Sequence, residues 1–205
     1  MCKLNKNEFM KKITAIIISV LALLIIVVTW VGRGYNLILV ESENATRAWS
    51  EVEANNQRRA DLIPGLVEAT KAAGTREAKT FTQVAEARAQ ATQLKIDVSN
   101  MTEGDIAKFQ QVQNGVAGAL GRLIAMKESY PQLHSNEAFL NLQRELSVTE
   151  NRIAAARYNY NKAAQDYNTK IRLFPYNIAA SITGYKAKPY FKADDGARYA
   201  TKVEF

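Results

Sequence analysis

The chain has 205 residues, of which 47% are hydrophobic and 23% charged, a balance typical of a folded protein and unlike that of a disordered chain. Its single cysteine, Cys2, excludes a disulfide bond within the chain. The net charge of +7 does not indicate a nucleic-acid partner, because part of it lies in the first 12 residues and the other basic residues are mixed with acidic ones, as on a solvated helix surface.

The first predicted element is a transmembrane helix at residues 13–31, after a short basic segment at residues 1–12. Residues 13–31 read ITAIIISVLALLIIVVTWV and contain no charged side chain. About 19 helical residues span close to the ~30 Å hydrocarbon core of a bilayer. The apolar run exceeds the roughly 7–15 residues of a cleaved secretory signal, and no Ala-x-Ala-like site follows it. We therefore expect a single uncleaved anchor that places residues 13–31 in the lipid bilayer.

Charges on the two sides of this helix predict its orientation. Its amino-terminal side carries Lys3, Lys6, Lys11 and Lys12. On the other side only Arg33 and Arg47 lie close to it in the sequence, and acidic residues accompany them. The positive-inside rule then predicts a cytoplasmic amino terminus and a domain outside the cytoplasm.

Residues 35–174 are predicted to form a helical bundle domain, because apolar residues recur at three- and four-residue intervals. The first helix is expected from Tyr35 to about Ile63, either continuing the membrane helix or kinked away from it, and to be interrupted by Pro64-Gly65. A second helix is expected from Leu66 through Gly74 to about Val98.

The third helix is expected to begin after Thr102 and to end near Tyr130-Pro131. Its start carries Thr102 followed three residues later by Asp105, a pattern similar to a capping box. The last helix is expected to run unbroken from Glu137 to Leu173, where Phe174-Pro175 stops it. Its nearly strict 3.5-residue spacing favours coiled-coil-like packing of near-parallel helices.

The fold class is therefore all-α: one amino-terminal transmembrane helix, an antiparallel bundle of about four helices, and an irregular tail. The tail, residues 175–205, is expected to be an extended strip that packs on the bundle through aromatic side chains such as Tyr190 and Phe191, and it ends in Val203-Glu204-Phe205.

The sequence offers no catalytic site. The one histidine, His134, lies in a predicted turn without the further ligands that a zinc site needs. Glycine-rich phosphate loops and activated Ser or Cys nucleophiles are also missing. We predict no catalytic residue, no metal, no cofactor and no small-molecule substrate.

Charged residues on or beside the apolar stripes form a candidate buried ion-pair network with a structural role. Its members are Arg59, Asp61, Glu150 and Arg157. Because a buried charge is stable only when paired, we expect either a contact of Arg59 with Glu150 or one of Arg157 with Asp61.

Several motifs along the chain resemble those of the LemA family. They include Arg58-Arg59-Ala60-Asp61-Leu62-Ile63-Pro64, Glu150-Asn151-Arg152-Ile153, Ala156-Arg157-Tyr158-Asn159 and Lys188-Pro189-Tyr190-Phe191. The resemblance implies a bacterial membrane protein with an antiparallel helical bundle and supplies no enzymatic activity or cofactor. It also implies an amino terminus outside the cytoplasm and a cytoplasmic domain, the reverse of the charge count, so both orientations stay open.

The expected function is that of a non-enzymatic scaffold or adaptor in the bacterial inner membrane, acting by self-association or by binding another membrane or envelope protein. Exposed charges such as Arg47, Glu51, Lys162 and Asp166 are candidates for setting the specificity of those contacts. The alternatives are an accessory or regulator of a membrane protease or envelope-stress pathway, suggested by the family resemblance, and a hydrolase that the sequence motifs do not reveal.

Overall fold

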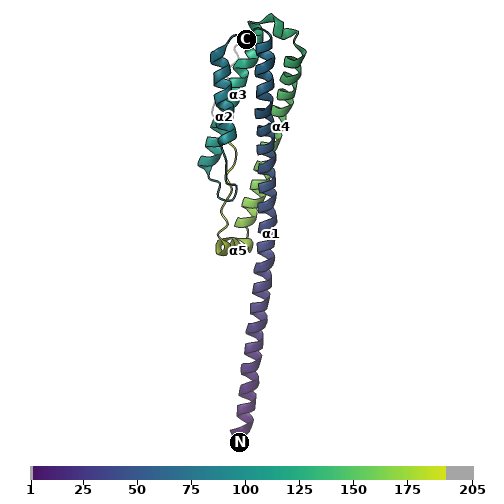
Figure 1. Ribbon diagram of the computed structural model, residues 1–205. Helices are drawn as coiled ribbons and strands as arrows, with labels where there is room; N and C mark the ends of the chain where they lie inside the picture. Colours follow the sequence, from purple (N-terminus) through teal and green to yellow (C-terminus); the bar gives the residue numbers. More distant parts are fainter. Residues whose placement is uncertain (1, 193–205) are drawn as a thin grey trace, which may run out of the picture. The chain divides into compact units, whose positions relative to one another are not determined.

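The computed structural model describes residues 2–192, with side chains from residue 8 onward, and its regular structure in that part of the chain is entirely helical. The helices are α1 (Cys2–Ala72), α2 (Ala78–Gln93), α3 (Glu103–Ala125), α4 (Glu137–Arg172) and α5 (Tyr176–Thr183), with short 3₁₀ turns η1 (Met126–Glu128) and η2 (Pro131–His134) (Figure 1). The predicted all-α fold class is confirmed.

The described chain divides into two compact units. Unit 1 contains residues 2–43 and 166–187, and unit 2 contains residues 44–165 and 188–192. Helices α1 and α4 each contribute residues to both units. The predicted membrane helix and the first bundle helix thus belong to one continuous helix, α1.

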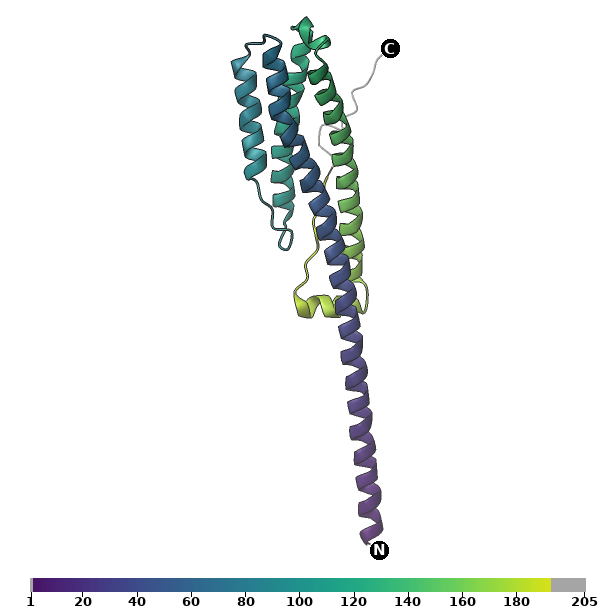
Figure 2. The same cartoon turned by 45° about the vertical axis from the view of Figure 1, so that its right-hand side comes forward.

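Unit 2 is the helical bundle. Residues 44–72 of α1, helices α2 and α3, and residues 137–165 of α4 lie side by side with alternating chain direction (Figures 1 and 2). One part of the core lies around Leu66, Leu123 and Phe139, and a second, aromatic part lies around Trp49 and Tyr160. These side chains belong to the apolar residues that recur at three- and four-residue intervals along each helix. Their burial in a common core explains why the sequence shows this spacing.

The expected interruption at Pro64-Gly65 is wrong, because α1 continues to Ala72 with Pro64 inside it. Proline has no N–H, so the carbonyl of Ala60 loses its partner within the helix. The Nε of Arg88, on α2, donates to that oxygen at 3.0 Å and restores a hydrogen bond. Gly65 also allows a close approach of α4, since a Cβ there would lie 3.2 Å from Cδ1 of Leu142.

The second predicted helix is also corrected. The expected passage through Gly74 does not occur, because Gly74 has a left-handed backbone (φ +81°) that ends the α1 helical path. Thr75, buried just beyond, donates its hydroxyl to the carbonyl of Thr70 at 2.8 Å and fixes this turn. Helix α2 then occupies Ala78–Gln93, which is shorter than expected at both ends.

The capping pattern before α3 is confirmed. The Thr102 hydroxyl accepts a hydrogen bond from the Asp105 backbone N–H at 3.2 Å, and the Asp105 carboxylate accepts one from the Thr102 N–H at 2.9 Å. Hydrogen bonds from Thr102 hold the pKa of Asp105 below its usual value. Helix α4 spans Glu137–Arg172, one residue short of the predicted end.

Unit 1 holds the apolar segment of α1, the last part of α4, and α5. Its small core is formed by Ile38, Tyr167, Ile171, Ala179 and Ala180. The prediction that the tail is extended from residue 175 onward is wrong, because Tyr176–Thr183 form a helix. Residues 185–192 are extended, as expected, and residues 193–205, which include Val203-Glu204-Phe205, lie outside the described residues.

Within the described residues, one helix is long and apolar enough to cross a membrane. It is α1, whose most apolar 18-residue window has a mean hydropathy of 2.9 and is 0% buried. The side chains of residues 13–30 of the predicted span, among them Ile16, Leu23 and Val28, are exposed in the structure.

Candidate functional site

The predicted polar network is centred on Arg59 of α1, a side chain with only 2% of its residue surface exposed. Its Nη1 donates to the Glu150 carboxylate on α4, at 3.0 Å to Oε1 and 3.3 Å to Oε2. Its Nη2 donates to Oδ1 of Asn56 at 3.1 Å, to the backbone carbonyl of Gln113 on α3 at 3.2 Å, and to Oε1 of Gln113. One guanidinium thus connects three helices of unit 2.

The structure brings together one of the two expected pairs. Arg59 and Glu150 are in contact, whereas Asp61 accepts a hydrogen bond from Nε2 of Gln57, one turn earlier on α1, at 2.8 Å. The guanidinium of Arg157 lies over the ring of Phe191, 5.3 Å from its centroid. The alternative pairing of Arg157 with Asp61 stays a prediction.

Sequence reasoning missed two amide side chains of this network, Asn56 and Gln113, which are 6% and 3% exposed. Asn56 lies at helical spacing from the apolar residues Trp49, Val52 and Ile63 of α1, and a polar residue on such a stripe is itself a signal for a buried hydrogen bond. Its Nδ2 donates to the carbonyl of Val52 at 2.7 Å, so both ends of the amide are used. Buried polar groups bonded to one another in this way fix which helices pack together and in which register.

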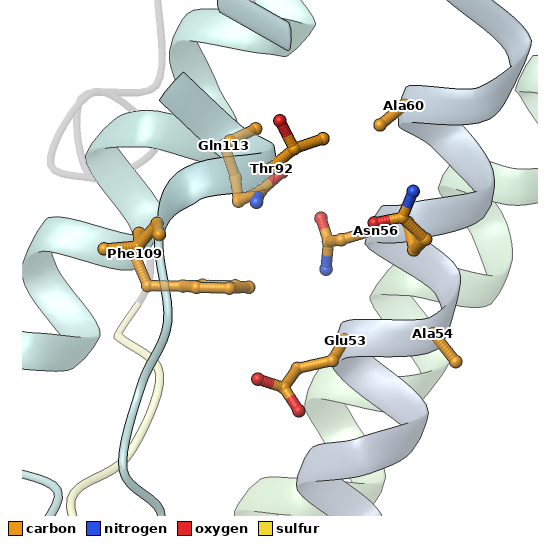
Figure 3. Close-up of a pocket in the computed structure, with 10 residues that line it drawn as sticks. Glu53, Ala54, Asn56, Ala60, Thr92, Phe109 and Gln113 are labelled. Carbon is orange, nitrogen blue, oxygen red and sulfur yellow. The ribbon is translucent and has the colours of Figure 1, made fainter. Parts of the chain in front are cut away.

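A cavity of about 260 Å³ lies next to the network, between α1, α2 and α3 (Figure 3). Asn56, Thr92, Phe109 and Gln113 are among the side chains that line it, and Glu53 lies at its edge. Among the described residues that line the cavity, Glu53 is the one with an ionisable side chain. General acid–base catalysis needs a proton donor or acceptor in a defined geometry. The side-chain oxygens of Asn56 and Gln113 instead accept hydrogen bonds from Arg59.

A second arrangement that the motifs did not predict holds the tail strip on unit 2. Asn161 of α4 binds the backbone of Phe191 twice: its Nδ2 donates to the Phe191 carbonyl at 3.0 Å, and its Oδ1 accepts from the Phe191 N–H at 2.9 Å. The Phe191 ring stacks on Trp49, with centroids 5.7 Å apart and planes 9° apart. The expected packing of the tail through its aromatic side chains is thus confirmed for Phe191.

Tyrosine hydroxyls fix the extended segment at two more points. Tyr160 donates to the carbonyl of Pro189 at 3.1 Å in unit 2, and Tyr167 donates to that of Lys186 at 3.0 Å in unit 1. Burial raises the pKa of Tyr160, and it raises the pKa of Tyr167 to about 12. Both phenols therefore stay protonated, as donors, over the whole physiological range.

His134 is exposed, at the end of η2. Within residues 8–192, no three His, Cys, Asp or Glu side chains gather where they could hold a metal ion.

Comparison with known proteins places these features in a family. The sequence profile of the LemA family matches residues 48–205. The chain is similar to magnetosome protein MamQ 2 of Paramagnetospirillum magneticum, with 31% identity over 86% of this chain and 71% of the relative. It is also similar to magnetosome protein MamQ of Magnetospirillum gryphiswaldense, with 30% identity over 85% of this chain and 70% of the relative. Protein LemA of Metamycoplasma hominis is 24% identical over 83% of this chain and 74% of its own length.

Proposed function

This chain belongs to the LemA family, and from that premise we propose that it is a membrane-anchored scaffold or adaptor that works through protein–protein contacts and catalyses no reaction. The observation that carries this proposal is the continuity of α1, which joins an exposed apolar segment of membrane-spanning length to the first helix of the bundle. Such a protein is attached to a bilayer through residues 13–31 and presents the helices of unit 2 to other proteins.

The membrane part of the proposal rests on physical chemistry. A water-facing helix does not tolerate a run of side chains such as Ile16, Leu23 and Val28 exposed on all sides, whereas a bilayer accommodates it. We place this single span in the bacterial inner membrane. The lysines before it favour a cytoplasmic amino terminus, and the opposite orientation is the competing proposal.

The scaffold part rests on where the polar groups of unit 2 are used. Arg59, Asn56 and Gln113 bind one another inside the bundle, and this is a structural role. Charged side chains at Glu51 and Lys162 are exposed, and so is Arg47, which also bonds Asn44. Confinement to a membrane plane raises the effective concentration of weakly interacting partners. The description of two relatives as magnetosome proteins names a cellular structure and no reaction, which also favours a structural role.

The test is site-specific photo-crosslinking of the full chain in membranes of the native host. Crosslinkers at Glu51 and Lys162 report on the exposed faces of unit 2, and a crosslinker at the buried Val84 is the matched control. We expect adducts from both exposed positions. Lys162→Glu should reduce the adducts of the crosslinker at residue 51 several-fold, and Glu51→Lys should do the same for the crosslinker at residue 162.

The identity of the adducts separates the remaining alternatives. Adducts dominated by the chain itself indicate a self-assembling scaffold, and a reproducible membrane-protease adduct indicates the accessory role. A chain that is monomeric in mild detergent, forms no adduct in cells and turns over a substrate after purification would overturn the proposal in favour of an enzyme.

A further inference from the structure

Unit 1 exposes a set of large apolar side chains outside the predicted span. Leu173 and Phe174, in the turn after α4, are 51% and 73% exposed, and Ile178 and Ile182, on α5, are 41% and 73% exposed. Large apolar side chains exposed close together in the chain normally mark a contact with another molecule or a membrane. We refer to these four residues as the α5 patch.

The α5 patch lies at the end of the apolar segment of α1. The Phe174 ring contacts the Trp30 ring edge-on, with centroids 5.7 Å apart, and Trp30 belongs to the last turn of the predicted span. One turn further along α1, Gly34 packs so closely on α5 that a Cβ there would lie 3.4 Å from Cδ1 of Tyr176. The α5 patch is therefore held at the depth where α1 leaves the apolar region.

Helix α5 has two different faces. Ala179 and Ala180 are buried in the core of unit 1, and their small size permits the close contact with α1. Ile178 and Ile182 are four residues apart and share one edge, while the polar Asn177 is exposed on another. Both views show α5 lying across α1 (Figures 1 and 2). A helix that crosses a membrane-spanning helix runs along the membrane plane, the position of an interfacial amphipathic helix.

The charges around the α5 patch fit phospholipid headgroups. Between Lys170 and Lys186 the chain contains basic residues and no acidic one. Arg172, at the end of α4, and Arg33, just after the span, are exposed, and the Nζ of Lys170 lies 5.2 Å from the centroid of the Tyr176 ring. Lysine and arginine near a bilayer surface interact favourably with anionic headgroups.

We propose that the turn after α4 together with α5 forms a second, interfacial membrane contact. In it Leu173, Phe174, Ile178 and Ile182 insert at the boundary of headgroups and acyl chains in the leaflet where α1 emerges. This inference rests on the proposed anchoring of residues 13–31 and extends it, because the chain then contacts the bilayer at two places far apart in sequence. The contact limits how unit 1 tilts and rotates relative to the membrane plane.

The test measures the depth of spin labels in the full chain reconstituted into phosphatidylcholine–phosphatidylglycerol vesicles. Cys2→Ser provides a cysteine-free background, into which Ile182→Cys, Asn177→Cys or Leu21→Cys is introduced and labelled with a nitroxide. Relative accessibility to apolar oxygen and to a water-soluble nickel chelate reports depth. We expect the oxygen-to-nickel ratio at residue 182 to be several-fold higher than at residue 177, the matched control on the same helix, and lower than at residue 21, inside the span.

Each outcome has a defined meaning. Equal, water-like ratios at residues 182 and 177 with a membrane-like ratio at residue 21 would overturn the interfacial contact and leave the anchor intact. A water-like ratio at residue 21 would overturn the anchor itself. Low accessibility of residue 182 to both reagents also contradicts the inference, because protein then covers the α5 patch. Broadening of the spectrum by spin–spin interaction would show that a second copy covers it. A spectrum without this broadening would show that the same chain covers it.

Discussion

At the scale of single residues, the side chain of Arg59 has the most demanding environment in unit 2, since a buried guanidinium is stable only while it is paired. Glu150 supplies the negative charge, and its side chain is 42% exposed, so water can solvate it if Arg59 is removed. The two partners are therefore unequal. Loss of Glu150 leaves a buried cation, whereas loss of Arg59 leaves a carboxylate that water can reach.

Because the two losses differ in this way, we predict that the stability effects of substituting Arg59 and Glu150 are not additive. Glu150→Gln should lower the free energy of unfolding by about 1–3 kcal/mol, below the ~3–5 kcal/mol of a fully buried pair because of the exposure of Glu150. In an Arg59→Met background the same change should cost close to nothing. The measurement is a double-mutant cycle by urea denaturation followed by circular dichroism. Strict additivity of the two substitutions would refute an energetic role for the contact.

The hydrogen bond between Arg88 and the carbonyl of Ala60 leads to a second prediction. Arg88→Met keeps the length of the side chain and leaves a buried carbonyl unpaired, which should cost about 1–3 kcal/mol in the same denaturation measurement. Pro64→Ala supplies the missing N–H, so Arg88→Met should cost less in that background. A cost that is the same in the parent chain and in the Pro64→Ala background would show that Arg88 does not compensate for the proline.

At the scale of elements, the extended segment at residues 185–192 depends on Asn161, which binds both backbone groups of Phe191. Asn161→Ala should destabilise unit 2 by about 1–3 kcal/mol and accelerate hydrogen exchange of the Phe191 amide. Asn159→Ala, on an exposed position of α4, is the matched control and should stay within about 0.5 kcal/mol of the parent. Unchanged exchange at Phe191 would mean that aromatic packing alone holds the segment.

The elements differ in how well the sequence predicted them, and the reason is the range of the interactions involved. Helix α4 was predicted to within one residue because its apolar spacing is uninterrupted, and the Thr102–Asp105 cap is likewise local. Pro64 misled the prediction because its compensation comes from Arg88, on another helix. Helix α5 was missed because eight residues carry little periodic signal and because contacts with Gly34 and Ile38, far away in sequence, stabilise it.

The contacts of the candidate site also differ in whether the sequence could predict them. Glu150 was expected beside Arg59 because both lie on or beside apolar stripes, where charges must pair. The additional bonds to Asn56 and Gln113 depend on how α1 and α3 are aligned along their axes, and one sequence does not determine that alignment.

At the scale of the whole molecule, orientation in the membrane has the largest consequence for function, because it decides which compartment supplies the partners. We expect a reporter fused after Phe205 to be active outside the cytoplasm, because lysines precede the span and few basic residues follow it closely. Replacing Lys3, Lys6, Lys11 and Lys12 by Gln should weaken this preference, with the unchanged chain as the control. A reporter that is active only in the cytoplasm would establish the reverse topology, the one implied by the family resemblance.

The stacking of Phe191 on Trp49 has an optical consequence. Trp49 is fully buried, and among the described residues its indole N–H has no hydrogen-bond partner, so we expect it to fluoresce at the short wavelengths typical of an apolar environment. Because Phe191 covers one face of the ring, release of the segment admits water and shifts the emission to longer wavelength. Trp30→Phe removes the other tryptophan. The emission wavelength of Trp49 then reports, in an intact membrane and without any added dye, whether the extended segment at residues 185–192 is bound to unit 2.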